Sequence, residues 1–101
     1  MTIPCPGCAQ AVPVTEFLAE CTTYAYGPGS VCWTCPACAD LNQFRIVDGS
    51  VEIGYVYLAG AAHFATMDEV AVPGLTVVPS PEQLLVHLGE RTWTIAAGRY
   101  G

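Results

Sequence analysis

The 101-residue sequence contains no lysine and only three arginines, against nine acidic side chains, so its formal net charge is −6. Affinity for nucleic acids comes mainly from cationic side chains that replace the counterions of phosphates. Arg45, Arg91 and Arg99 are scattered and cannot form a basic stripe. The same shortage disfavours binding to an anionic membrane surface. We therefore expect neither a nucleic acid nor a membrane as the direct partner.

The sequence also lacks a long hydrophobic run, although 52% of its residues are hydrophobic. The segment 53–67 has no acidic or basic residue other than His63, but at about 15 residues it is shorter than the roughly 20 that span a bilayer. We expect it to be a buried element or a surface that faces a partner. The N-terminus shows no basic region followed by an apolar core, so no secretion signal is predicted and a cytoplasmic location is expected.

Groups that could carry catalysis are sparse. The acidic residues are scattered, with Asp68 and Glu69 as the only adjacent pair. Within the predicted helix no carboxylate lies at ligand spacing from His87, none lies at that spacing from His63, and no phosphate-binding glycine loop is present. A catalytic site needs several acid–base or nucleophilic groups that converge. The sequence therefore predicts that the protein is not an enzyme.

The most specific feature is a pair of Cys-Pro-x-Cys motifs, Cys5–Cys8 and Cys35–Cys38, separated by residues 9–34. Each motif brings two thiolates to one side of a tight turn, and the spacer is long enough for a hairpin that carries the second turn to the first. Four thiolates close a tetrahedral site without an open position, which suits one structural Zn²⁺. Iron in the same cage and disulfides remain as alternatives, although a reducing cytosol favours metal over disulfides.

Residues 5–47 resemble a zinc ribbon, the domain found in transcription-associated factors and in short proteins of high-GC bacteria and their phages. The resemblance implies a three-stranded antiparallel sheet held by Cys5, Cys8, Cys35 and Cys38, and implies no activity. Rubredoxins share the two cysteine pairs, but they have glycine after each pair. This chain has Ala9 and Ala39 there.

Turn and strand patterns predict the elements of this ribbon. Residues 12–20 are expected to form a short strand and one helical turn that begins at Thr15. Residues 22–26 and 30–34 are β-prone on either side of Gly27-Pro28-Gly29, which predicts a hairpin, and residues 42–47 predict a third strand.

Simple pairing across the Gly27–Gly29 turn predicts two facing pairs. It places Cys21 opposite Cys35 and Tyr24 opposite Cys32.

After the ribbon, Asp48-Gly49 predicts a tight turn. Residues 51–66 fit either a strand or a helix, and the strand interpretation is preferred because Val51, Ile53 and Tyr55–Tyr57 favour it. Pairing across the turn would then place Arg45 opposite Glu52 and Phe44 opposite Ile53.

The C-terminal third is expected to hold an extended segment 69–78, broken at Pro73-Gly74. A helix is predicted to start at Ser80, which forms a capping box with Gln83, and to stop at Gly89. An edge strand follows over residues 91–96.

The predicted fold class is thus a small metal-stabilised α+β protein. Residues 1–48 form the zinc ribbon, and residues 49–101 form an α+β extension packed on it.

Some further residues have two interpretations. Cys21 and Cys32 are either small buried hydrophobes or members of a redox switch, because Cys32-Trp33-Thr34-Cys35 is itself a Cys-x-x-Cys run. The aromatic residues of the ribbon either fill the core of the sheet or form a contact face. These residues are Tyr24, Tyr26, Trp33 and Phe44.

The sequence favours a non-enzymatic zinc-ribbon interaction module or small regulatory subunit. Its partner is expected to be another protein or a second copy in a homo-oligomer. That partner would cover residues 55–64 or the outer face of the Trp93 strand. One alternative is a transcription-associated or phage regulatory factor that contacts RNA polymerase or a nucleic-acid enzyme. Another is a redox-sensing zinc switch.

Overall fold

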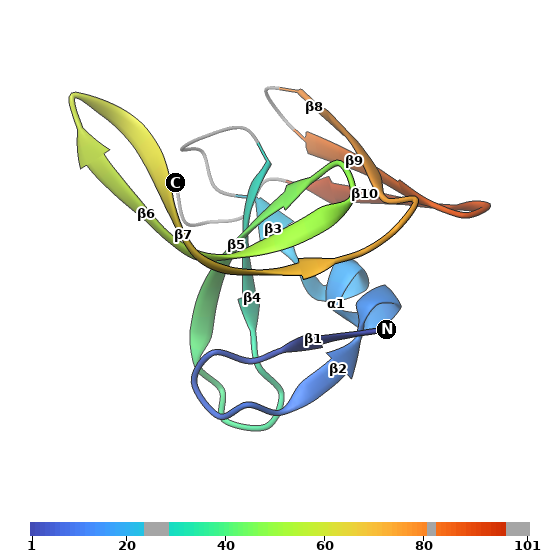
Figure 1. Cartoon of the computed structure of the whole chain (residues 1–101), viewed down its shortest axis with the longest axis horizontal. Coiled ribbons are helices and arrows are strands. Elements are labelled where there is room, and N and C mark those ends of the chain that lie inside the picture. The colour runs from blue at the N-terminus through green and yellow to red at the C-terminus, as the bar shows by residue number, and fades with distance from the viewer. Residues whose placement is uncertain (24–28, 81–82, 97–101) are drawn as a thin grey trace.

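The computed structural model describes residues 1–23, 29–80 and 83–96. In this part of the chain the fold is mostly antiparallel β with a single short helix (Figure 1). In chain order the elements are β1 (Thr2–Pro4), β2 (Ala11–Pro13), α1 (Val14–Glu20), β3 (Thr22–Thr23), β4 (Ser30–Thr34), β5 (Leu41–Val47), β6 (Ser50–Ala59), β7 (Ala61–Ala71), β8 (Thr76–Pro79), β9 (Gln83–Leu88) and β10 (Arg91–Ala96). They form a two-stranded sheet β1-β2, a five-stranded sheet β3-β4-β5-β6-β7 and a three-stranded sheet β10-β9-β8.

The five-stranded sheet contains the strands expected for the ribbon. β3, β4 and β5 are neighbours in it, but the sheet continues into β6 and β7 instead of ending after three strands. The expected boundary between residues 48 and 49 lies in the turn that joins β5 to β6, so both segments contribute strands to one sheet.

The predicted register of the first hairpin is wrong by two residues. Thr22 faces Cys32, the place that the prediction gave to Tyr24. Cys21 is the C-cap of α1 and donates its amide to the Phe17 carbonyl at 3.2 Å, so it takes no part in the hairpin and β3 begins at Thr22. Cys21 therefore ends a helix and does not face Cys35. Tyr24 and the turn at Gly27-Pro28 lie outside the described residues.

The strand interpretation of residues 51–66 is confirmed. β6 and β7 are long antiparallel strands, and the turn at Asp48-Gly49 sets the register of β5 and β6. Arg45 faces Glu52 and Phe44 faces Ile53, as predicted. Gly49 has a φ of 82°, a value that glycine adopts without strain.

The predicted helix over residues 80–88 is wrong, because Gln83–Leu88 is β9, the central strand of the three-stranded sheet. The capping-box residues do bond each other. Ser80 Oγ donates to the Gln83 carbonyl at 2.8 Å, and the Gln83 amide donates back to Ser80 Oγ at 3.3 Å. These bonds belong to the link between β8 and β9, and Pro81 and Glu82 lie outside the described residues.

Burial explains why the segment is a strand. Leu84 and Val86 are buried, while Leu85 and His87, which alternate with them, are partly exposed. This is the period of two of a half-buried strand. The predicted edge strand 91–96 is confirmed as β10, and Pro73-Gly74 separates β7 from β8 as expected.

One hydrophobic core joins the three sheets and α1. Its centre is an aromatic cluster in which the Phe17 ring lies 5.7 Å from Trp33 and 4.9 Å from Phe44. The helix supplies Phe17, one face of β4 supplies Trp33 and β5 supplies Phe44. The core interpretation of Trp33 and Phe44 is confirmed, whereas Tyr24 and Tyr26 lie outside the described residues. In the described part of the chain no helix has the length and apolar composition needed to cross a membrane.

Candidate metal centre

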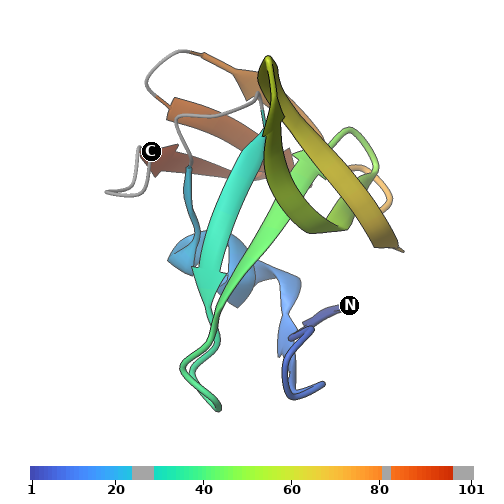
Figure 2. The ribbon, with the colours of Figure 1, turned by 90° about the vertical axis from the view of Figure 1, so that its left-hand side faces the viewer.

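Two loops of the same shape form the candidate site, one between β1 and β2 and one between β4 and β5. Both lie at the lower end of the molecule in Figures 1 and 2. In the first loop the Ala9 amide donates to the Cys5 carbonyl at 2.8 Å, and the Cys5 amide donates to the Gln10 carbonyl at 2.9 Å. The second loop repeats these bonds at 2.8 and 3.0 Å with Cys35, Ala39 and Asp40. The repetition follows from the same Cys-Pro-x-Cys-Ala sequence.

Ala9 and Ala39 close these loops in the left-handed region, with φ of 64° and 62°. They are the two non-glycine residues with positive φ in the described part of the chain. A side chain with a Cβ is strained in this conformation, so the loops keep their shape at an energetic cost.

The four predicted ligands are brought together. The Sγ atoms of Cys5, Cys8, Cys35 and Cys38 all lie within 4.8 Å of one another. The Sγ atoms of Cys5 and Cys38 are 3.7 Å apart, and those of Cys8 and Cys35 are also 3.7 Å apart. A regular tetrahedron of sulfurs around zinc at about 2.3 Å has edges of about 3.8 Å. The cluster therefore fits one metal ion such as zinc.

Burial differs between the four sulfurs. Cys5 and Cys35, the first cysteine of each loop, are buried and belong to the hydrophobic core. Cys38 is partly exposed and Cys8 is exposed. The cluster is thus attached to the core on one side and reaches the surface on the other.

Backbone amides and one side chain point at the sulfurs. The amide of Gln10 bonds Cys8, and the amide of Asp40 bonds Cys38. Asn42 Nδ2 donates to Cys5 Sγ at 3.5 Å. Such donors orient metal-bound thiolates and offset their charge. Asn42 was predicted as a strand residue and not as part of the site, although its position at the start of the strand that follows the second loop is a usable signal.

The thiols influence one another's ionisation. Burial opposes ionisation of Cys35, but the amides of Cys38 and Ala37 favour its thiolate and the pKa is lowered to about 7. The Asp40 amide favours the Cys38 thiolate, yet burial and the neighbouring thiols raise the pKa of Cys38 to about 12. Four thiolates at this spacing repel one another, and a divalent cation bound between them would make all four stable together.

The remaining two cysteines lie outside the cluster. Cys21 Sγ donates to the Phe17 carbonyl at 3.0 Å, and burial raises the pKa of the Cys21 thiol well above its ordinary value. Cys32 Sγ lies 3.0 Å from Thr22 Oγ1. Both thiols are buried, in keeping with the core interpretation.

Each histidine makes a local contact that differs from metal coordination. The His63 ring stacks on Tyr57 with centroids 5.4 Å apart, and His87 Nδ1 lies 2.9 Å from Thr92 Oγ1. Neither belongs to the group of possible metal ligands found among the described residues.

A groove of about 550 Å³ lies beside the cysteine cluster. Its lining is largely apolar and includes Pro4, Leu41, Tyr55 and Met67. Asn42 also lines it, so one side chain contacts both the groove and a cluster sulfur.

Comparisons of the chain with protein-family models, with curated proteins and with solved structures found no match. The structure therefore supports a four-cysteine site that fits a metal ion, without assigning the chain to a family.

Proposed function

We propose that this protein is a non-enzymatic interaction module or small regulatory subunit, held together by one structural Zn²⁺ on Cys5, Cys8, Cys35 and Cys38. A site with four protein ligands leaves no position for a substrate or an activated water, which is the pattern of structural zinc. The ion would join the β1–β2 loop to the β4–β5 loop and so fix one end of the sheet.

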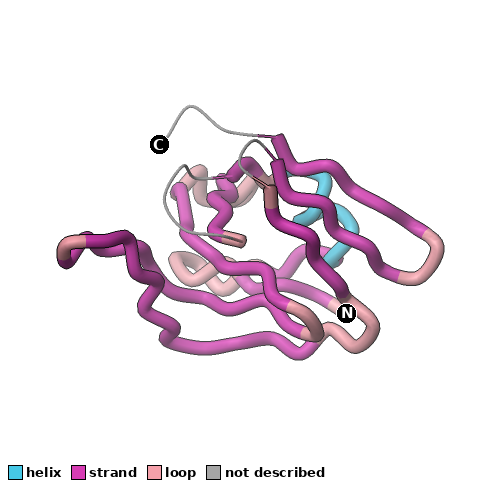
Figure 3. Tube along the Cα trace, turned by 90° about the horizontal axis from the view of Figure 1, so that it is seen from above, coloured by secondary structure: helices cyan, strands magenta, loops and turns pink. Residues whose placement is uncertain are grey.

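The interaction surface that we propose lies on a projecting hairpin formed by β6 and β7. β5 pairs with β6 no further than Gln43 and Gly54, and beyond that point β6 and β7 pair with each other alone. We call residues 55–65 the arm. It extends away from the rest of the chain at the left of Figures 1 and 3. A two-stranded hairpin alone is only marginally stable in water, so the arm gains from being covered.

The surface of the arm is apolar and aromatic. Tyr55, Tyr57 and Leu58 are 50%, 45% and 68% exposed. The Tyr55 and Tyr57 rings lie 6.2 Å apart on one face, beside the stacked His63. Tyrosine is enriched at protein interfaces because it buries a large area and keeps a polar tip. A protein partner is the occupant that this chemistry favours.

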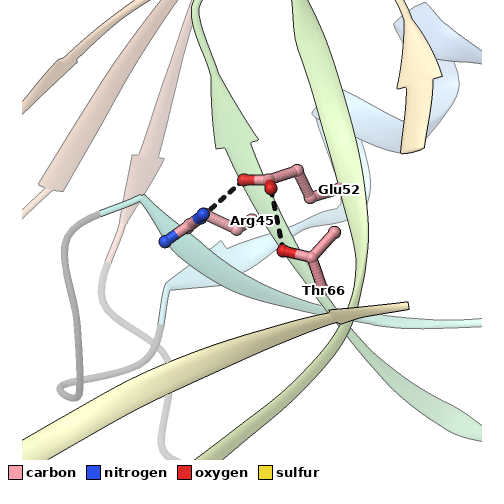
Figure 4. A network of polar contacts seen from close by, with 3 residues as sticks. All are labelled: Arg45, Glu52 and Thr66. Atoms are coloured by element: carbon pink, nitrogen blue, oxygen red, sulfur yellow. Dashed lines mark hydrogen bonds and ion pairs between the residues drawn. The ribbon is translucent and has the colours of Figure 1, made fainter. Parts of the chain in front are cut away.

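The base of the arm is tied to the sheet by a polar network across three strands (Figure 4). Arg45 Nε donates to Glu52 Oε1 at 2.6 Å, and Thr66 Oγ1 donates to Glu52 Oε2 at 2.8 Å. The hydrogen bond from Arg45 lowers the pKa of Glu52. The Arg45 guanidinium also lies 5.3 Å from the centre of the Phe64 ring. These contacts hold the arm in one direction, which favours recognition by a rigid surface.

Site-specific photocrosslinking tests the proposal. A benzophenone amino acid replaces Tyr57 on the arm or, as the control, the exposed Thr94 on β10. In a lysate of the native host we expect adducts from position 57, with another protein or with a second copy, and few from position 94. Removal of zinc by a chelator should abolish them. Equal labelling from both positions, or none from the arm, would contradict the proposal.

A further inference from the structure

The outer edge of β7 is the longest open strand edge in the described part of the chain. β7 is the last strand of the five-stranded sheet, and β6 is its one neighbour there. At the opposite edge, β3 has two described residues, and Thr23 Oγ1 donates to the Ala96 carbonyl of β10 at 3.3 Å. Proteins usually protect long edges with proline, lysine or a covering loop, and β7 contains neither of these residues.

A hydrogen bond that the Gln43 side chain accepts shows which backbone groups of β7 face outward. The Val56 amide donates to Gln43 Oε1 at 2.6 Å, so the backbone groups of Val56 point toward β5 and away from β7. Val56 faces Phe64 in the register of β6 and β7. In an antiparallel pair that does not exchange hydrogen bonds, the groups of both residues point away from the partner strand. The N–H and C=O of Phe64 therefore point to the open edge.

The same alternation applies to the residues two positions away. Ala62 and Thr66 face Leu58 and Gly54, so their N–H and C=O groups also point outward. Among the described residues, Phe64 and Thr66 form no backbone–backbone hydrogen bond outside the pairing of their own sheet. The regular open edge thus covers residues 62–66.

At the end where the arm joins the sheet, the open edge stops at a register shift and at a carboxylate. The register shifts between Ile53 and Gly54, so Met67 has no facing residue. Past the shift, Asp68 Oδ1 accepts the Glu69 amide at 2.8 Å, which occupies a donor of the strand with a side chain of the same chain. The edge is closed by this bond at Glu69 and stays open from Ala62 to Thr66.

We infer that the partner of the arm is a second copy of this chain, joined by antiparallel pairing of the two β7 edges about a two-fold axis at Phe64. This inference rests on the proposed function and names its partner. In this register Phe64 exchanges both backbone bonds with Phe64 of the second copy, and Ala62 does so with Thr66. The arms of two copies then form one four-stranded sheet.

Charge supports a second copy in this register. The chain carries a net charge of −6, so most contacts between copies bring like charges together. Segment 61–67, centred on Phe64, contains no Asp, Glu, Lys or Arg. With Phe64 facing Phe64, Asp68 faces Gly60 of the second copy and not another acid. Pairing is thus confined to the uncharged part of the strand.

The first experiment measures the mass of the zinc-loaded full chain across a range of concentrations. We expect a concentration-dependent dimer. The substitution Ala62→Pro removes an outward amide that is not needed for pairing with β6, and proline is tolerated at such edge positions. It removes two intermolecular hydrogen bonds from the dimer, so the dissociation constant should rise at least roughly tenfold. Circular dichroism and zinc content verify that the variant is folded.

Hydrogen exchange of the unmodified chain is the second measurement and needs no variant. The amides of Ala62, Phe64 and Thr66 should become protected as the concentration rises. The amides of His63 and Ala65, which point toward β6, should be protected equally at low and high concentration.

A monomer at all concentrations, or exchange at Phe64 that does not depend on concentration, would overturn the second copy as partner. If arm-specific crosslinks to a different protein persist in that case, the proposed function stands and only this inference fails. A dimer that Ala62→Pro leaves unchanged would overturn the proposed register.

Discussion

At the scale of single residues, Ala9 and Ala39 determine the shape of the two loops that hold the cysteine cluster. Each lies in the left-handed region and donates its amide to the first cysteine of its loop. The left-handed conformation costs a residue with a Cβ roughly 1–2 kcal/mol, whereas glycine adopts it freely. The loops thus keep the hydrogen bonds of a metal knuckle while they carry local strain.

Ala9→Gly and Ala39→Gly should each stabilise the zinc-loaded protein by about 0.5–1 kcal/mol. Relief of strain is partly offset by the greater freedom of glycine in the unfolded chain. Urea unfolding at fixed free zinc measures the effect. Ala37→Gly is the matched control, because Ala37 is in the second loop without a positive φ, and it should destabilise slightly. Unfolding midpoints of both variants at or below that of the parent would refute the strain argument.

At the scale of elements, the arm depends on a close approach at its base. Gly54 lies where the register of β6 and β7 shifts, and a Cβ at this position would overlap the carbonyl oxygen of Ala65. The space next to the Gly54 backbone is therefore occupied by the facing strand. A side chain here forces β6 and β7 apart just where the arm leaves the sheet.

Gly54→Ala should destabilise the protein by at least about 2 kcal/mol, the cost of inserting an atom against backbone. Gly60→Ala at the tip of the arm is the comparison, because Gly60 has a φ of 80° but open space around its Cβ position. That variant should lose only about 1 kcal/mol, from backbone strain. Urea unfolding compares the two. Equal losses would mean that the contact with Ala65 is relieved without cost.

At the scale of the whole molecule, the cysteine cluster and the hydrophobic core are one structure. Cys5 and Cys35 are buried among the core residues, so their sulfurs are positioned by the same packing that holds Trp33 and Phe44. Zinc binding in small metal modules is worth about 10–16 kcal/mol, as large as the whole stability of a typical domain. Folding and metal binding are therefore expected to be coupled.

Cys8→Ser should abolish stoichiometric zinc binding and leave the chain largely unfolded. Cys32→Ser, which replaces a buried thiol beside Thr22, should keep one zinc per chain and the fold of the parent. Elemental analysis and circular dichroism measure both variants, and an excess of chelator should unfold the parent. A parent protein without bound metal, or a red one that contains iron, would exclude the zinc assignment. A folded Cys8→Ser variant with one zinc per chain would exclude Cys8 as a ligand.

Features that depend on neighbouring residues could be predicted from the amino-acid sequence. The two Cys-Pro-x-Cys loops, the turn at Asp48-Gly49 and the pairing of Arg45 with Glu52 follow from local turn chemistry and from the alternation of a strand. The four clustered cysteines were predicted for the same reason, since two local motifs and a hairpin between them leave few arrangements.

Features that depend on residues far apart in the chain became visible in the folded structure alone. A serine that bonds a glutamine three positions later is common to a helix start and to a tight turn, so Ser80 and Gln83 did not distinguish them. Packing of Leu84 and Val86 into the core between β8 and β10 selected the strand. The pairing of Thr22 with Cys32 and the open edge at Phe64 likewise depend on how separate strands assemble into the sheet. Pairing of strands is a contact between distant parts of the chain, and its register is chosen by the core that those parts build together.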